Sequence, residues 1–155
     1  MLTAHLPGGY VSARIANVYA AAPFCAVLVG SVFPDLDLIW FYWIDDRAFH
    51  HHRYWVHIPG FWLIVAAVGV PMFKFIAPSF TPVLLAFFGG VAVHILLDSL
   101  AGSIAWLWPF DNRLFALFDV PASQSHWILS FLFHWTFVIE LLIWRAAAML
   151  WWRSR

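Results

Sequence analysis

The chain has 155 residues, of which 64% are hydrophobic and 20% aromatic, and only 10% are charged. An ordinary soluble domain carries about 25% charged residues, and one of this length cannot bury so much apolar surface, so the composition predicts an integral membrane protein. The formal net charge of zero and the lack of a basic block argue against a nucleic-acid partner. The single cysteine, Cys25, excludes an internal disulfide and a cysteine-based zinc site. We expect one domain over residues 1–155.

Four apolar segments predict membrane helices, because a spanning helix needs about 20 largely apolar residues. The first segment, 18–33, is marginal and is interrupted by Pro23. The three longer segments are 58–77, 82–108 and 127–152. The expected fold is therefore all-α: an integral membrane bundle of about four transmembrane helices, with a short N-terminal interfacial or re-entrant helix around 9–17.

Four crossings would place the loops 34–57 and 109–126 on one membrane face. The N-terminus, the turn 78–81 and the C-terminus would then share the other face. Five basic residues against three favour a cytoplasmic location for both termini. Tryptophans flank both long loops and recur near the C-terminus, as expected for two interfacial belts.

Ionisable residues gather near the long loops. The PDLD motif puts Asp35 and Asp37 directly after the first segment, where a simple turn is the alternative interpretation. The stretch HHHRYWVH, 50–57, holds four histidines in eight positions. Neutral imidazole binds metals without adding charge, so the stretch indicates a metal site; a solvated interfacial loop is the alternative.

The pair His94 and Asp98 lies inside the third segment. A spacing of four residues puts both side chains on one helix face, and ionisable residues at membrane depth are costly and usually functional. A polar pair that joins helices is the alternative. In the last segment, His134 and Glu140 are six residues apart and face roughly opposite ways, so a shared metal is disfavoured.

Glu140, His134 and the neighbouring His126 have separate expectations. Glu140 is expected to pair with Arg145 near the other membrane surface. His134 and His126 are peripheral candidates for the site, of which His126 is the better placed because it begins the segment on the site face.

The order of these motifs resembles one family. His5, Pro34-Asp35-Leu36-Asp37, His52-Arg53 followed by His57, and His94-Ile-Leu-Leu-Asp98 match, in order and rough spacing, the YdjM-like membrane-bound, metal-dependent hydrolases. These are also described as LexA-binding, inner-membrane-associated hydrolases. The resemblance runs from about residue 5 to Pro109. The family is distantly similar to zinc-dependent phospholipase C and P1 nuclease.

The resemblance implies phosphoester hydrolysis with a divalent metal, zinc or alternatively manganese, in the bacterial inner membrane. The implied metal ligands are His5, Asp35, Asp37, His52, His57, His94 and Asp98. Arg53 would orient phosphate, and Asp37 or Asp98 would act as the base. Tyr54-Trp55-Val56 departs from the family's usual Gly-x-Thr.

The expected function is hydrolysis of a phosphoester in a lipid or lipid-linked substrate at the membrane surface, with membrane lipids as the partners. One alternative is a non-catalytic protein that binds or transports a metal ion or proton, and another is a structural subunit without metal. His5 would reach the site only if 8–33 formed a re-entrant hairpin bent near Pro23.

Overall fold

The computed structural model of the protein describes residues 3–155. This part of the chain is helical and contains no β-strand, only an isolated bridge between Ile104 and Phe115, which confirms the all-α prediction. The α-helices are α1 (His5–Ile15), α2 (Ala21–Gly30), α3 (Asp37–Trp43), α4 (Pro59–Ile76), α5 (Thr81–Ala101), α6 (Trp127–Leu132) and α7 (Phe137–Arg153). The 3₁₀ helices are η1 (Pro34–Leu36), η2 (His51–Arg53), η3 (Trp55–His57) and η4 (Pro78–Phe80).

Fewer helices can cross a membrane than the sequence predicts. In the described residues, Pro59–Ile76 and Pro78–Ala101 are long and apolar enough, and the pair Ala21–Gly30 and Pro34–Trp43, bent by 52°, adds a third if it forms one span. The expectation of four spanning helices is therefore wrong.

The predicted segment 127–152 is broken between α6 and α7. At the break, the His134 ring accepts from the backbone N–H of Thr136 at 3.5 Å and pairs with the Thr136 hydroxyl at 2.9 Å, so local side-chain hydrogen bonds replace helical ones. The remaining α7 has 17 residues, or about 26 Å, slightly less than a hydrocarbon core of about 30 Å.

The N-terminal segment forms a helical hairpin of α1 and α2. The chain reverses at 16–20, where Asn17 has φ 56°, a left-handed conformation that asparagine tolerates. Pro23 lies in the first turn of α2, where its missing N–H has no helical partner to lose, so the hairpin bends at Asn17 and not at Pro23.

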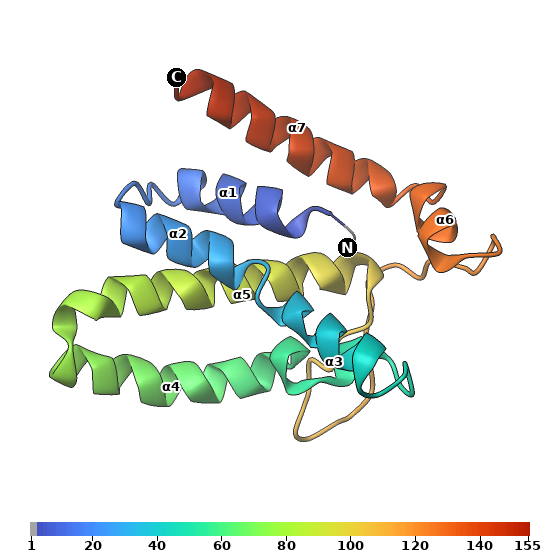
Figure 1. Cartoon of the computed structure of the whole chain (residues 1–155), viewed down its shortest axis with the longest axis horizontal. Helices are drawn as coiled ribbons and strands as arrows, with labels where there is room; N and C mark the ends of the chain where they lie inside the picture. Colours follow the sequence, from blue (N-terminus) through green and yellow to red (C-terminus); the bar gives the residue numbers. More distant parts are fainter. Residues whose placement is uncertain (1–2) are drawn as a thin grey trace.

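This hairpin changes the expected topology. The start of α1 lies at the same end of the molecule as α3 and the loop after it, whereas the turn between α4 and α5 lies at the opposite end (Figure 1). The expectation that the N-terminus shares a face with the turn 78–81 is therefore wrong, and His5 lies at the end that carries the long loops.

Helix α5 is the centre of the bundle, and α1, α2 and α4 all pack against it. The approach of α2 to α5 is close because two glycines face the opposing backbones. A methyl group at Gly90 would lie 2.8 Å from Ser31 N, and one at Gly30 would lie 3.1 Å from Val91 N. Val91 also belongs to a small core with Ile95 and Ile104.

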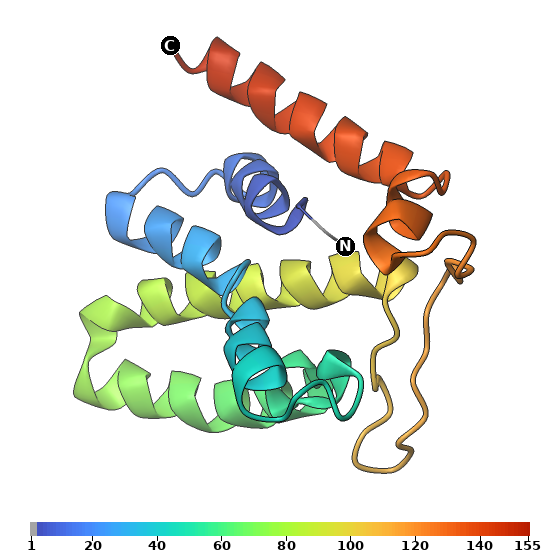
Figure 2. The ribbon, with the colours of Figure 1, turned by 45° about the vertical axis from the view of Figure 1, so that its right-hand side comes forward.

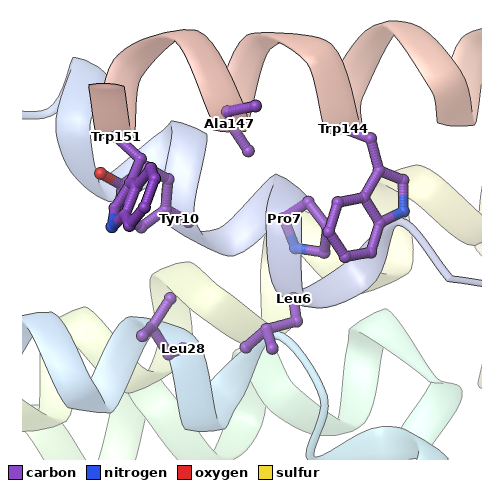
Figure 3. Close-up of a pocket in the computed structure, with 8 residues that line it drawn as sticks. Leu6, Pro7, Tyr10, Leu28, Trp144, Ala147 and Trp151 are labelled. Atoms are coloured by element: carbon purple, nitrogen blue, oxygen red, sulfur yellow. The ribbon is translucent and has the colours of Figure 1, made fainter. Parts of the chain in front are cut away.

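The outer surface is apolar. Helix α4 has no buried residue, and α7 runs along the outer side of α1, opposite α4 (Figure 1, Figure 2). Between α7, α1 and α2 lies an apolar groove of about 320 Å³ (Figure 3). Leu6, Leu28 and Trp144 are among its lining residues, and it contains none of the expected metal ligands.

Candidate metal centre

Side chains from three separate segments converge beside the last two turns of α5. His94 and Asp98 lie on one face of this helix with exposed fractions of 0% and 1%. The bend between α2 and α3 places Asp35, in η1, against them, and η3 ends with the fully buried His57. The predicted pair on α5 therefore meets one residue from the PDLD motif and one from the histidine-rich stretch.

Four donor atoms from these residues face one another. His94 Nε2 lies 3.0 Å from Asp98 Oδ2, 3.3 Å from His57 Nε2 and 3.7 Å from Asp35 Oδ1. His57 Nε2 lies 3.7 Å from Asp98 Oδ2 and 4.0 Å from Asp35 Oδ1. Zinc bonds of about 2.0–2.1 Å give a tetrahedron with edges of about 3.3 Å. The five separations, 3.0–4.0 Å, bracket this edge, so His57 and His94 have, with either carboxylate, the spacing of ligands of one metal ion.

The His94 ring is oriented by its second nitrogen. His94 Nδ1 lies 2.9 Å from the carbonyl oxygen of Ser31, which only accepts, so Nδ1–H donates and Nε2 is the nitrogen that faces the other three donor atoms. A ring nitrogen held by a backbone carbonyl in this way is the usual orientation of a metal-binding histidine.

His5 bridges the outer oxygens of the two carboxylates. Its Nδ1 lies 3.0 Å from Asp35 Oδ2, and its Nε2 lies 3.0 Å from Asp98 Oδ1. Burial alone would lower the pKa of His5, but the hydrogen bonds and negative charges of both carboxylates outweigh it and raise the pKa to about 9. His5 could also be grouped with His94 and Asp98 as a triple of donors. Because both of its nitrogens are occupied, we assign it to orienting the carboxylates.

The expected ligands His52 and Asp37 lie beside this set. His52 Nε2 is 3.5 Å from Asp98 Oδ2. Burial, with the neighbouring histidines, outweighs Asp98 and lowers the pKa of His52 to about 2, so its ring is neutral, as a metal ligand requires. Asp37 Oδ2 lies 3.0 Å from His57 Nδ1, behind the ring that contributes to the tetrahedral set.

One residue of the histidine-rich stretch that was not among the ligands implied by the family resemblance also belongs to the cluster. His51, with His52 and His57, forms a second group of three donors close enough to hold an ion. The signal for it was present, because three consecutive histidines precede Arg53, but sequence alone did not show which of them turn inward.

The remaining expected residues lie outside the cluster. Arg53 is exposed and makes no ion pair with any described residue. His126 accepts from the N–H of Ile128 at the start of α6, and His134 is bonded to Thr136.

Glu140 differs from its expected pairing with Arg145, because no ion pair joins them in the described part of the chain. The carboxylate is fully buried and accepts from Thr3 N at 3.0 Å and Thr3 Oγ1 at 2.8 Å. Glu140 therefore anchors the segment that precedes His5.

Two cavities reach the cluster from the loop side. One of about 270 Å³ is lined by Asp35, Leu38, Phe41, Tyr42, His50, His51 and Trp127. Another of about 470 Å³ is mostly aromatic and includes Asp37, Trp40 and Trp55. The Asp35 side chain is 32% exposed, whereas those of His94 and Asp98 are closed off, so the first cavity gives access to the donor set through Asp35.

Comparison with known proteins identifies the family. The sequence profile described as "YdjM inner membrane protein" matches residues 1–153. No curated protein and no solved structure matches the chain. The chain belongs to the YdjM inner membrane protein family, which confirms the resemblance and agrees with its apolar helices.

Proposed function

We propose that this protein is a metal-dependent hydrolase of the inner membrane that cleaves a phosphoester in a lipid or lipid-linked substrate. The observation that carries the proposal is the close approach of Asp35 Oδ1 and Asp98 Oδ2 to the Nε2 atoms of His57 and His94, at 3.0–4.0 Å. Nitrogen and carboxylate donors at this spacing suit zinc, and manganese also accepts them. When bound, such a metal lowers the pKa of water towards about 7 and polarises a phosphoryl oxygen.

The chain's own residues supply the other requirements of hydrolysis. His5 and the Ser31 carbonyl hold the ligands in place through their outer atoms. The expected base was Asp37 or Asp98. Asp98 is enclosed by histidines and Asp37 lies behind His57, so neither residue lines the first cavity, from which a base would have to act.

His50 and His51 do line the first cavity. Burial, followed by the charges of its neighbours His51 and His57, lowers the pKa of His50. His50 is therefore a neutral acceptor at physiological pH and is a candidate to take a proton from water. Arg53 lines neither cavity, and nothing in its position supports phosphate orientation.

The position of the cluster favours a substrate at the level of lipid headgroups. His94 and Asp98 lie in the last two turns of α5, and α4 begins directly after His57. Exposed tryptophans surround this end of the bundle: Trp40, Trp43, Trp55, Trp106 and Trp127. Tryptophan is enriched where a membrane meets water, so the cluster would sit beside phosphate groups of lipids.

Transport of a metal or proton is the alternative function, and it requires polar groups that continue towards the far end of the bundle. The cavity on that side, between α1, α2 and α5, is lined by Ser12 and otherwise apolar residues or glycine. The described residues therefore favour a local site over a conducting path.

The test is hydrolysis of defined lipids by the purified protein. Phospholipid and lipid-pyrophosphate vesicles would be incubated with zinc- or manganese-loaded protein, and the products followed by mass spectrometry. We expect metal-dependent product formation, abolished by Asp98→Asn and unchanged by substitution of an exposed residue of α7, Arg145→Ala. Bound metal without turnover of any of these lipids would contradict the proposal and favour a non-catalytic metal-binding protein.

A further inference from the structure

The apolar stretch WLWPF, 106–110, forms the tip of a hairpin and not the end of a membrane helix, because α5 ends before it. The backbones of Ile104 and Phe115 exchange two hydrogen bonds of 2.9 Å and close this hairpin, 104–115. At the tip, Phe110 is 95% exposed, and Leu107 is half-exposed. Large apolar side chains gathered on a protein surface mark a site of interaction with a partner or a membrane.

Both strands of the hairpin are attached to the end of α5 that carries Asp98. On the first strand, Ile104 is fully buried against α5, and the indole N–H of Trp106 donates to the hydroxyl of Ser99 at 2.8 Å. After the second strand, the N–H of Leu117 donates to the carbonyl oxygen of Ser99 at 2.8 Å. Since Ser99 directly follows Asp98, the position of the hairpin is fixed relative to the metal centre.

The tip of the hairpin lies at the depth where a membrane span begins. A methyl group at Gly60, in the first turn of α4, would lie 2.6 Å from the carbonyl oxygen of Trp108 and 3.3 Å from its ring. The hairpin therefore contacts the start of Pro59–Ile76, a helix long and apolar enough to cross a membrane. Figure 2 shows the hairpin extending from the end of α5 past the start of α4. These contacts place the tip at one boundary of the bilayer.

The backbone of the tip makes its own hydrogen bonds. The N–H groups of Phe110 and Asp111 both donate to the carbonyl oxygen of Leu107, at 2.9 and 3.0 Å, and Pro109 has no N–H. Unpaired backbone groups are costly in lipid, so this closed turn suits contact with a bilayer. The first charged residues after the tip neutralise each other, because Asp111 pairs with Arg113 at 2.6 Å.

We propose that the tip of this hairpin inserts into the lipid bilayer at the boundary between headgroups and acyl chains, beside the metal centre. Leu107 and Phe110 would lie among the first acyl carbons, and the Asp111–Arg113 pair among the headgroups. Apolar faces of interfacial segments enter this boundary by about 5–10 Å, and tryptophan is enriched there. The inserted tip would hold the metal centre at the level of lipid phosphates. That consequence rests on the proposed function, whereas the insertion itself does not.

The test is the depth of a spin label at the tip, in nanodiscs of phosphatidylethanolamine and phosphatidylglycerol. Cys25, the single cysteine, would be replaced by alanine, and the label attached in Phe110→Cys or in the matched control Asn112→Cys, an exposed position two residues further on. Oxygen collides with labels in lipid, and a water-soluble nickel chelate collides with labels in water. We expect several-fold more oxygen collisions and several-fold fewer nickel collisions at residue 110 than at residue 112.

Two results would overturn the insertion. Nickel collisions that are equal at residues 110 and 112 would place the tip in water. Few collisions with both reagents at residue 110 would show that a protein surface, such as a second copy of the chain, covers the tip.

The consequence for hydrolysis has a separate test. Phe110→Asp should slow hydrolysis of vesicle lipids several-fold and leave that of a short-chain, water-soluble phosphoester unchanged. Equal slowing with both substrates would contradict a role of the tip in reaching lipids. Wild-type protein that hydrolyses neither substrate would refute the proposed function, whereas the label depth decides the insertion by itself.

Discussion

Adding a methyl group at Gly90 should disrupt the metal centre from a distance. In Gly90→Ala the new methyl would lie 2.8 Å from Ser31 N and would overlap the carbonyl oxygen of Val27. Ordinary contacts of carbon are about 3.5 Å, so α2 has to move away from α5 by roughly 1 Å. That movement carries the Ser31 carbonyl away from His94 Nδ1, now at 2.9 Å, and Asp35 away from His94 Nε2, now at 3.7 Å.

The neighbouring glycine supplies a matched control. A methyl at Gly89 meets nothing within 4 Å, and replacing a helical glycine with alanine is favourable by about 1 kcal/mol. Overpacking at Gly90 should instead cost about 1–3 kcal/mol. We expect Gly90→Ala to bind zinc at least tenfold more weakly in competition with a chromophoric chelator, whereas Gly89→Ala should bind like the wild type. Wild-type zinc affinity and thermal stability in Gly90→Ala would refute the proposed coupling between helix packing and the metal centre.

Three further outcomes are expected. Glu140→Ala removes the fully buried carboxylate that accepts from the N–H and hydroxyl of Thr3, and should lower the free energy of unfolding in detergent by about 1–3 kcal/mol. Exposed Arg145→Ala should change it by less than about 0.5 kcal/mol, and equal effects would contradict this role of Glu140. In protein freed of metal by a chelator, the raised pKa of His5 means that its contribution to the free energy of unfolding is complete below pH 6.5 and is lost as the pH rises to about 9. The melting temperature of the wild type should therefore fall over this pH range, and that of His5→Gln should not. An equal fall in His5→Gln would exclude His5 as the cause. Zinc at 100 times its dissociation constant should stabilise the wild type by about 2.7 kcal/mol but should not stabilise His94→Ala, so an equal shift in both would place the zinc elsewhere.

The sequence predicted the parts of the site that depend on local geometry. His94 and Asp98 are four residues apart in an apolar helix, so their common face follows from helix periodicity alone. Asp35 and His57 lie near the two ends of the segment 34–57, which precedes α4. Their convergence follows from the order of the segments once the loop is placed beside α5.

The placement of His5 did not follow from the sequence, because it depends on tertiary structure. Helices of 11 and 10 residues, α1 and α2, are too short to give a clear spanning signal, and their apolar residues resemble one span broken at Pro23. The reversal at Asn17 depends on a single left-handed residue. Likewise, the break before α7 depends on side-chain hydrogen bonds of His134, which no hydropathy pattern reveals.

The most direct test of the account is the zinc content of detergent-purified protein beside Asp98→Asn and His94→Ala. The account predicts bound zinc in the wild type and loss of the ion held between His57, His94, Asp35 and Asp98 in each variant, with both variants still eluting as folded protein. Zinc content that is the same in all three proteins, or no zinc in any of them after growth with added metal and without chelators, would contradict it.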